Sequence, residues 1–153
     1  MAKPASKTKP SRSLETPPAG PGSYVLVLHL PDPVRLTIGK LGEFDFQVGW
    51  YLYSGSAMNG LRGRIARHLR SEHRVHWHID YLNSSTTGAT VEAVGWAEGK
   101  TRQECEWATA IADLPGSSRP VPGFGSSDCA CESHLVHSPG DTEFNAWIRQ
   151  NLD

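Results

Sequence analysis

The sequence has no apolar run near the roughly 20 residues that a membrane-spanning helix needs. Its longest strongly apolar stretch, residues 24–28, has only the length of a strand. The N-terminus also lacks the apolar core of a signal peptide. Only three cysteines are present, an odd number that does not suit a secreted disulfide framework. These absences predict a protein without a membrane segment in the reducing cytosol, and therefore a cytoplasmic localisation.

A strong net charge of either sign is also missing. The 15 Lys and Arg residues nearly balance the 16 Asp and Glu residues, which gives a formal net charge of -1. This balance argues against a histone-like or polybasic protein, although a local basic patch is compatible with it. The charge is unevenly spread, because residues 60–80 hold five arginines and two acids, whereas residues 83–153 hold ten acids and four bases.

The first 21 residues differ in composition from the rest of the chain. They contain five prolines and no aromatic residue, and their basic side chains oppose a single glutamate. Such a segment cannot bury enough surface to offset its ordering entropy, so we expect residues 1–21 to be a disordered basic arm. The arm is either a solubilising tail or a weak, non-specific ligand for phosphates. Residues 22–153 suffice for one folded domain.

The hydrophobic pattern of this domain changes from strands to helices along the chain. Three strands with short links come first and favour an antiparallel β-meander: residues 23–30, 34–38 and 48–53. Helices are then expected over residues 61–69, 76–82, 101–114 and 142–152, with strands over residues 91–96 and 135–137. The expected fold class is α+β, with a central antiparallel sheet flanked by helices.

The arginine-rich segment is a candidate nucleic-acid interface. It contains no lysine, and guanidinium groups bind phosphate in a planar, bidentate way that ammonium groups do not. Histidines and a tryptophan are interleaved with the arginines. A solvated helix face is the alternative interpretation. The candidate contacts to nucleic acid are Arg62, Arg67, Arg70, Arg74, His76 and His78.

Three short motifs follow one another in the same region. Gly22-Ser23-Tyr24 begins the first strand, Tyr53-Ser54-Gly55-Ser56 lies at the end of the third, and Arg64 precedes His68 by four residues on the next helix. That spacing places Arg64 and His68 on one helical face, which the helix can hold over the sheet near both tyrosines. Core packing of the tyrosines and of His68, and a surface position for Arg64, are the alternatives.

In order and spacing these motifs resemble those of the GIY-YIG endonuclease superfamily, with Ser23 and Ser54 in place of its isoleucines. The sequence is more similar still to a small subfamily of uncharacterised domains, some of them fused to endonuclease III. That similarity covers residues 22–137, including HWHIDYL at residues 76–82 and GFGSSDC at residues 123–129. The resemblance implies a GIY-YIG-like domain that hydrolyses phosphodiester bonds of DNA in repair or processing, with a DNA-repair protein as partner. The alternative is a non-catalytic nucleic-acid-binding module on the same scaffold.

The resemblance also implies a catalytic set of five residues: Tyr24, Tyr53, Arg64, His68 and Glu104. The family binds its metal through a Glu on a later helix, and Glu104 matches it best because Trp107 follows three residues later, with Glu106 as the fallback. Glu104 has a competing interpretation, since Thr101 three residues earlier would form a capping box with it. The late Asn of many GIY-YIG domains has no clear counterpart here.

The chemistry of phosphodiester hydrolysis suits these residue types. It requires a nucleophilic water, a metal ion that polarises the phosphate, and a cation for the charge that develops. One carboxylate can hold Mg²⁺ or Mn²⁺ if water and a substrate phosphate fill the other positions, which suits Glu104, while Arg64 suits the phosphate. The resemblance suggests that Tyr24 takes the proton of the water, with Tyr53 or His68 assisting. A phenol with a pKa of ~10 needs such help at neutral pH.

A second cluster of metal-ligand types lies near the C-terminus. Cys129, Cys131 and His134, with Cys105 or His137, have the residue types of a tetrahedral zinc site. The Cys-x-Cys spacing is tighter than the usual C-x₂₋₄-C, so packing, or a loop that shapes the site, is the favoured interpretation. A structural zinc protein is therefore a third functional class for this chain.

Overall fold

The computed structural model describes residues 16–70, 75, 77–125 and 132–152. A four-stranded antiparallel sheet has the order β5-β1-β4-β6 and consists of β1 (Gly22–Leu30), β4 (Gly49–Ala57), β5 (Thr90–Glu98) and β6 (Leu135–Ser138). A separate two-stranded sheet pairs β2 (Val34–Thr37) with β3 (Glu43–Phe46), and the short 3-10 helix η1 (Gly39–Leu41) links them. The α+β class and the antiparallel sheet flanked by helices are confirmed.

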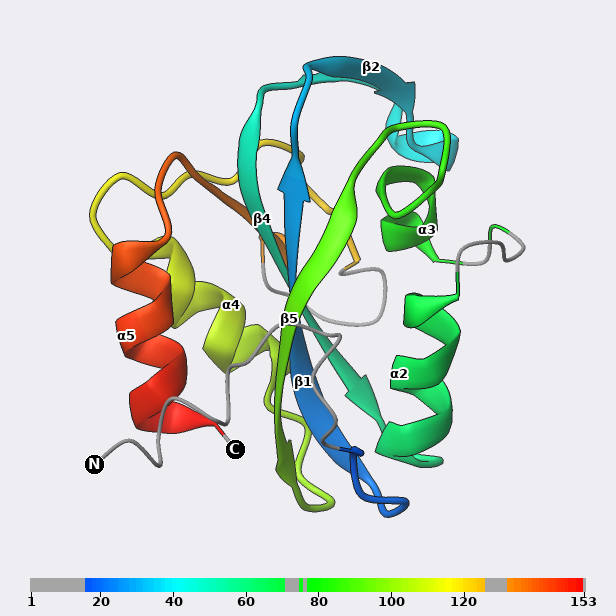
Figure 1. Cartoon of the computed structure of the whole chain (residues 1–153), viewed down its shortest axis with the longest axis vertical. Helices are drawn as coiled ribbons and strands as arrows, with labels where there is room; N and C mark the ends of the chain where they lie inside the picture. The colour runs from blue at the N-terminus through cyan, green and yellow to red at the C-terminus, as the bar shows by residue number, and fades with distance from the viewer. Residues whose placement is uncertain (1–15, 71–74, 76, 126–131, 153) are drawn as a thin grey trace.

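Helices cover both faces of the large sheet (Figure 1). On one side lie α2 (Leu61–Leu69) and α3 (His78–Leu82), and on the other lie α4 (Glu104–Ala112) and α5 (Thr142–Asn151). Because successive side chains of a strand point to opposite faces, β1 contributes Tyr24 and Leu26 to the first core and Val25 and Val27 to the second. Burial on both faces explains why β1 is almost continuously apolar.

The strand pairing differs from the expected meander. The predicted second strand, β2, pairs only with β3, a strand that the sequence did not reveal, and β4 takes the place next to β1. All nine residues of β4 find a partner on β1, whereas β2 has four residues in a half-exposed pattern. The longer, fully buried pair removes more apolar surface from water and therefore forms the centre of the sheet.

The start of α4 also differs from the sequence-based expectation. The helix begins at Glu104, with Gln103 at the N-cap and no side-chain cap. The predicted capping box between Thr101 and Glu104 is therefore wrong, because Thr101 lies before the helix. The backbone N–H of Gln103 instead donates to the Ser23 hydroxyl at 3.0 Å, which ties the start of α4 to β1. Glu104 is thus available for contacts other than capping.

The described end of the predicted arm lies against α2. The backbone N–H groups of Leu61 and Arg62 donate to the carbonyl oxygens of Gly20 and Pro18 at 2.9 and 3.0 Å. These bonds satisfy two donors that every helix start leaves unpaired, which matters because the N-cap, Gly60, provides no side chain. Residues 1–15, which make up most of the predicted arm, lie outside the described residues. No helix within the described ranges is long and apolar enough to cross a membrane.

Candidate functional site

Tyr24 and His68 form a buried pair where β1 meets α2. The Tyr24 hydroxyl and His68 Nε2 are hydrogen-bonded at 2.8 Å, and each residue is 1% exposed. The Tyr53 ring lies 6.4 Å from the Tyr24 ring and 6.3 Å from the His68 ring, centroid to centroid. Tyr24 is paired with Gly55 on β4, where a Cβ atom would lie 2.6 Å from the Tyr24 hydroxyl oxygen. Gly55 therefore leaves the space that the phenol occupies.

The environment keeps both phenols protonated at neutral pH. Burial raises the pKa of Tyr24 to about 12, although the positive charge of Arg64 and a hydrogen bond from it act in the opposite direction. Burial also raises the pKa of Tyr53 well above its usual value, with a further contribution from Tyr24. Neither tyrosine is a pre-formed phenolate, so Tyr24 can accept a proton only if His68 takes the proton that Tyr24 already carries.

Two arginines of α2 share one tryptophan ring. The guanidinium carbons of Arg64 and Arg67 lie 4.5 and 4.4 Å from the centroid of Trp77, within the range of cation–π contacts. Arg67 also forms two 3.1 Å hydrogen bonds with the buried carboxylate of Asp80, which accepts a third from the Trp77 backbone N–H at 2.8 Å. Arg67 is thus neutralised, whereas Arg64 forms no ion pair with any described carboxylate. Its charge is available to an anionic ligand.

Glu104 lies on the other face of the sheet and contacts Ser56 near the end of β4. Its carboxylate accepts a hydrogen bond from the Ser56 hydroxyl, which lies 2.8 Å from the hydroxyl of Ser23. The Ser56 carbonyl in turn accepts a hydrogen bond from Arg64 Nη1 at 3.0 Å, so Ser56 contacts both Glu104 and Arg64. The side chain of Glu104 is 14% exposed, and its negative charge raises the pKa of Tyr24 as a minor contribution.

These contacts meet at an open strand edge. β6 pairs with β4 only over residues 50–53, and no described strand pairs with the outer edge of residues 55–57. We call the group around this edge, Tyr24, Ser56, Arg64, His68 and Glu104, the β4-edge site. The structure thus brings together four of the five predicted catalytic residues, with Tyr53 packed behind them. Tyr24 and Glu104 lie on opposite faces of the sheet and approach each other only around its edge.

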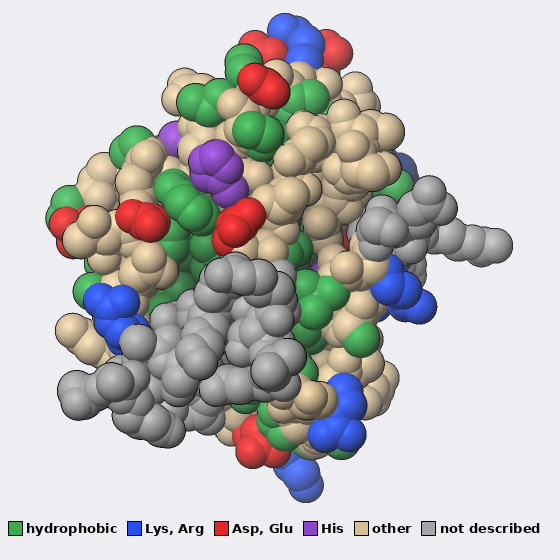
Figure 2. All heavy atoms as spheres, viewed as in Figure 1, with side chains coloured by type: hydrophobic (Ala, Val, Ile, Leu, Met, Phe, Trp, Pro, Cys, Tyr) green, Lys and Arg blue, Asp and Glu red, His purple; other side chains and the backbone are tan. Residues whose placement is uncertain are grey.

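The predicted nucleic-acid contacts are distributed along and beyond α2. Figure 2 shows Lys and Arg side chains over the α2 side of the molecule. Arg62 is exposed and donates to the Pro17 carbonyl at 2.9 Å, and Arg70 ends the helix as an exposed residue. His78 accepts a hydrogen bond from the Gly125 backbone N–H at 2.7 Å, so it holds the loop that packs on Tyr53. Arg74 and His76 lie outside the described residues.

The predicted zinc ligands are only partly described. His134 Nε2 lies 3.3 Å from the sulfur of Cys105. His137 lies elsewhere, because its Nε2 is hydrogen-bonded to the Val48 carbonyl at 3.0 Å. Burial lowers the pKa of His134, while the charge of Glu104 acts in the opposite direction. Cys129 and Cys131 lie outside the described ranges, within which no three His, Cys, Asp or Glu residues are grouped to hold a metal ion.

Sequence reasoning missed the roles of the serines and the contacts that support Arg64. Ser23 was noted only as a departure from a motif, but it links Gln103 to Ser56. The period of two would have placed Ser23 and Ser56 on the face opposite Tyr24, where α4 packs. The sequence pointed to Trp77 among the arginines and to Asp80 in a polar cluster with His76 and His78 that supports the site. It did not indicate their contacts with α2, since these depend on how the chain returns after that helix.

A family model described as "Domain of unknown function DUF123" matches residues 23–153. The chain therefore belongs to this family of domains of unknown function. No curated protein and no solved structure matches the chain.

Proposed function

We propose that this domain is a metal-dependent, GIY-YIG-like endonuclease that hydrolyses phosphodiester bonds of DNA in repair or processing. The observation that carries the proposal is the position of Ser56, which binds Arg64 through its carbonyl and the carboxylate of Glu104 through its hydroxyl. Arg64 forms no ion pair with a carboxylate in the described part of the chain. A phosphate group at this open edge can meet a cation and a potential metal ligand together. A cytoplasmic location and a DNA-repair partner belong to the same proposal.

The donor set fits a hard divalent cation such as Mg²⁺ or Mn²⁺. Glu104 provides one partly exposed carboxylate beside the Ser56 hydroxyl, and Mg²⁺ is commonly held by one or two carboxylates, with waters and substrate oxygens completing its shell. Such an ion, when bound, polarises the phosphate and lowers the pKa of a water molecule. Arg64 would bind a non-bridging phosphate oxygen, and Trp77 keeps its guanidinium in place.

Tyr24 and His68 would act together on the proton of the attacking water. With a pKa of about 12, a phenolate of Tyr24 near pH 7.5 would cost about 6 kcal/mol to form before the reaction. A transfer in one step avoids most of this cost: the Tyr24 oxygen accepts the proton of the water while its own proton passes along the 2.8 Å hydrogen bond to His68 Nε2. Both residues are then needed, and His68 must begin with Nε2 unprotonated.

The test is a cleavage assay on nicked, branched and single-stranded DNA with Mg²⁺ or Mn²⁺. We expect Glu104→Gln and Arg64→Gln to lower the cleavage rate by about 10²- to 10⁴-fold, as expected for loss of electrostatic stabilisation. Glu106→Gln is the matched control, because Glu106 is exposed on the same helix and has no described contact in the site. If no substrate is cut, or if Glu104→Gln cuts as fast as Glu106→Gln, the proposal fails.

A non-catalytic DNA-binding module is the second candidate. The observation that favours it is the burial of Tyr24, which limits the access of a water molecule to its hydroxyl and keeps the phenol protonated. This function predicts salt-dependent binding of DNA that Arg64→Ala and Arg67→Ala weaken. It also predicts that DNA remains intact with any divalent cation, which separates the two candidates in the same assay.

A further inference from the structure

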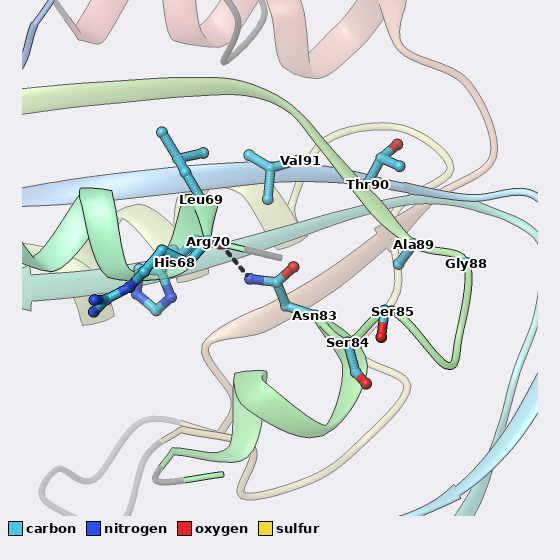
Figure 3. Close-up of a pocket in the computed structure, with 10 residues that line it drawn as sticks. All are labelled: His68, Leu69, Arg70, Asn83, Ser84, Ser85, Gly88, Ala89, Thr90 and Val91. Atoms are coloured by element: carbon cyan, nitrogen blue, oxygen red, sulfur yellow. Dashed lines mark hydrogen bonds between the residues drawn. The ribbon is translucent and has the colours of Figure 1, made fainter. Parts of the chain in front are cut away.

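A second site lies on the β5 side of α2. A cavity of about 510 Å³ lies between the end of α2, the end of α3 and the start of β5. Figure 3 shows the residues that line it. This volume is within the range of about 300–1,000 Å³ that is typical of small-molecule sites. His68 belongs to both sites, because its ring contacts Tyr24 and its backbone carbonyl accepts a hydrogen bond from Asn83 in the cavity.

The polar groups of the cavity are arranged around Asn83. This side chain is 8% exposed, and its Nδ2 donates to the His68 carbonyl at 2.8 Å, which fixes the orientation of the amide. The amide oxygen points into the cavity in Figure 3, and no described residue donates a hydrogen bond to it. This amide oxygen can accept a hydrogen bond from an N–H or O–H group of a ligand in the cavity.

The rest of the lining selects the ligand further. Leu69, which is 42% exposed, and Val91 give an apolar wall, and Ser84 and Ser85 provide hydroxyl groups. Among the described lining residues, Arg70 carries the only charged side chain. A flat apolar ring against the wall, an amino group on Asn83 and an anionic group at Arg70 would match all of these features. A nucleotide with an amino-bearing base has this combination of groups.

We propose that this cavity binds one nucleotide of a DNA strand, with its adenine or cytosine base extruded from the stack. The choice of strand rests on the proposed function, in which Arg64 holds a phosphate. Arg64 and Arg70 are six residues apart, or about 9 Å along a helix axis, and phosphates of one DNA strand rise about 3.4 Å each. A strand held at Arg64 therefore brings a nucleotide two or three positions away to the mouth of the cavity.

The first test uses mononucleotides and needs no cleavage. The isotope-labelled chain is titrated with dAMP, dCMP, dTMP and inorganic phosphate, and the amide resonances of Asn83, Ser85 and Thr90 are followed by NMR. We expect dAMP or dCMP to shift them at lower concentrations than dTMP, because only the former present an exocyclic amino group to Asn83. The proposal is overturned if inorganic phosphate alone produces the same shifts, or if no nucleotide shifts them.

A cavity-filling variant gives the matched comparison. Ser85 is exposed at the cavity, so Ser85→Phe fills it without entering the core, and Gln150→Phe adds the same bulk to an exposed position of α5 on the other side of the sheet. We expect the dissociation constant for dAMP or dCMP to rise about tenfold or more in Ser85→Phe and to stay unchanged in Gln150→Phe. Unchanged binding by Ser85→Phe would refute the assignment.

A DNA strand that contains 2-aminopurine connects the two sites. The probe lacks the 6-amino group of adenine, so it is placed beside an adenine, and its fluorescence rises when that neighbour leaves the stack. We expect this rise with the wild type and with Glu104→Gln but not with Ser85→Phe. A rise that persists in Ser85→Phe contradicts base extrusion into this cavity. If the wild type binds mononucleotides but cuts no DNA, the endonuclease proposal fails while the cavity assignment is supported.

Discussion

Replacing Gly55 with alanine adds one Cβ atom, which should disrupt the Tyr24–His68 pair. A Cβ atom at residue 55 would lie 2.6 Å from both Cζ and the hydroxyl oxygen of Tyr24 and 3.0 Å from Cε1. The ring cannot simply swing away, because Tyr53 and His68 pack around it and it is 1% exposed. The phenol must therefore shift and lose its 2.8 Å hydrogen bond to His68 Nε2, or the strands must separate locally.

The expected cost follows from three terms. Overpacking of a buried site costs about 1–3 kcal/mol, and a buried hydroxyl that loses its partner costs about 1–3 kcal/mol more. Replacement of glycine returns roughly 0.4–1 kcal/mol by restricting the unfolded chain. The net loss in the free energy of unfolding should therefore be about 1–6 kcal/mol, and the cleavage rate should fall because the Tyr24–His68 geometry is lost.

The assay is urea unfolding of single and double variants. Gly63→Ala is the control: a Cβ atom there meets nothing within 4 Å, and an alanine inside α2 should stabilise the domain by up to about 1 kcal/mol. In a Tyr24→Leu background the obstructing ring is absent, so Gly55→Ala should cost less than about 1 kcal/mol. Equal costs of Gly55→Ala in both backgrounds would show that the clash with Tyr24 is not the cause.

Three further perturbations probe the surroundings of this pair. Asp80→Asn should lower the unfolding free energy by about 3–5 kcal/mol, because it leaves the largely buried Arg67 without its carboxylate. The double variant with Arg67→Met should recover much of this loss, as measured by urea unfolding. Ser23→Ala removes the link between α4 and Ser56 and should slow cleavage about tenfold while Glu104 remains present. Burial lowers the pKa of His78, so folding favours its neutral form. This contribution to stability is present above the unfolded pKa of about 6.5 and decreases as the pH falls below that value. Urea midpoints of the wild type and of His78→Gln near pH 7.5 and pH 5.5 will measure it.

Helical periodicity was the most informative part of the sequence. The predicted helix at residues 61–69 coincides with α2, because Leu61 and Ile65 repeat at the spacing of one buried face. Strand partners were harder to predict, since pairing depends on which long strand buries the most surface and not on neighbourhood in the sequence. The sequence placed the motif at the end of the third strand but ended that strand at Tyr53, whereas β4 continues through the motif to Ala57.

The position of Glu104 shows why the candidate site could be predicted as a set of residues but not as a geometry. The sequence indicated that Tyr24, Arg64 and Glu104 belong to one candidate site. It could not indicate that α4 lies on the opposite face of the sheet from α2. Side chains on opposite faces of a sheet interior are separated by the backbone layer and cannot share a ligand. The two faces meet here at Ser56, because β6 pairs only with residues 50–53 of β4 and no described strand pairs with residues 55–57 on that edge. The short length of β6 is therefore a condition for the site, and an extension of β6 along residues 55–57 would close it even with every motif residue in place.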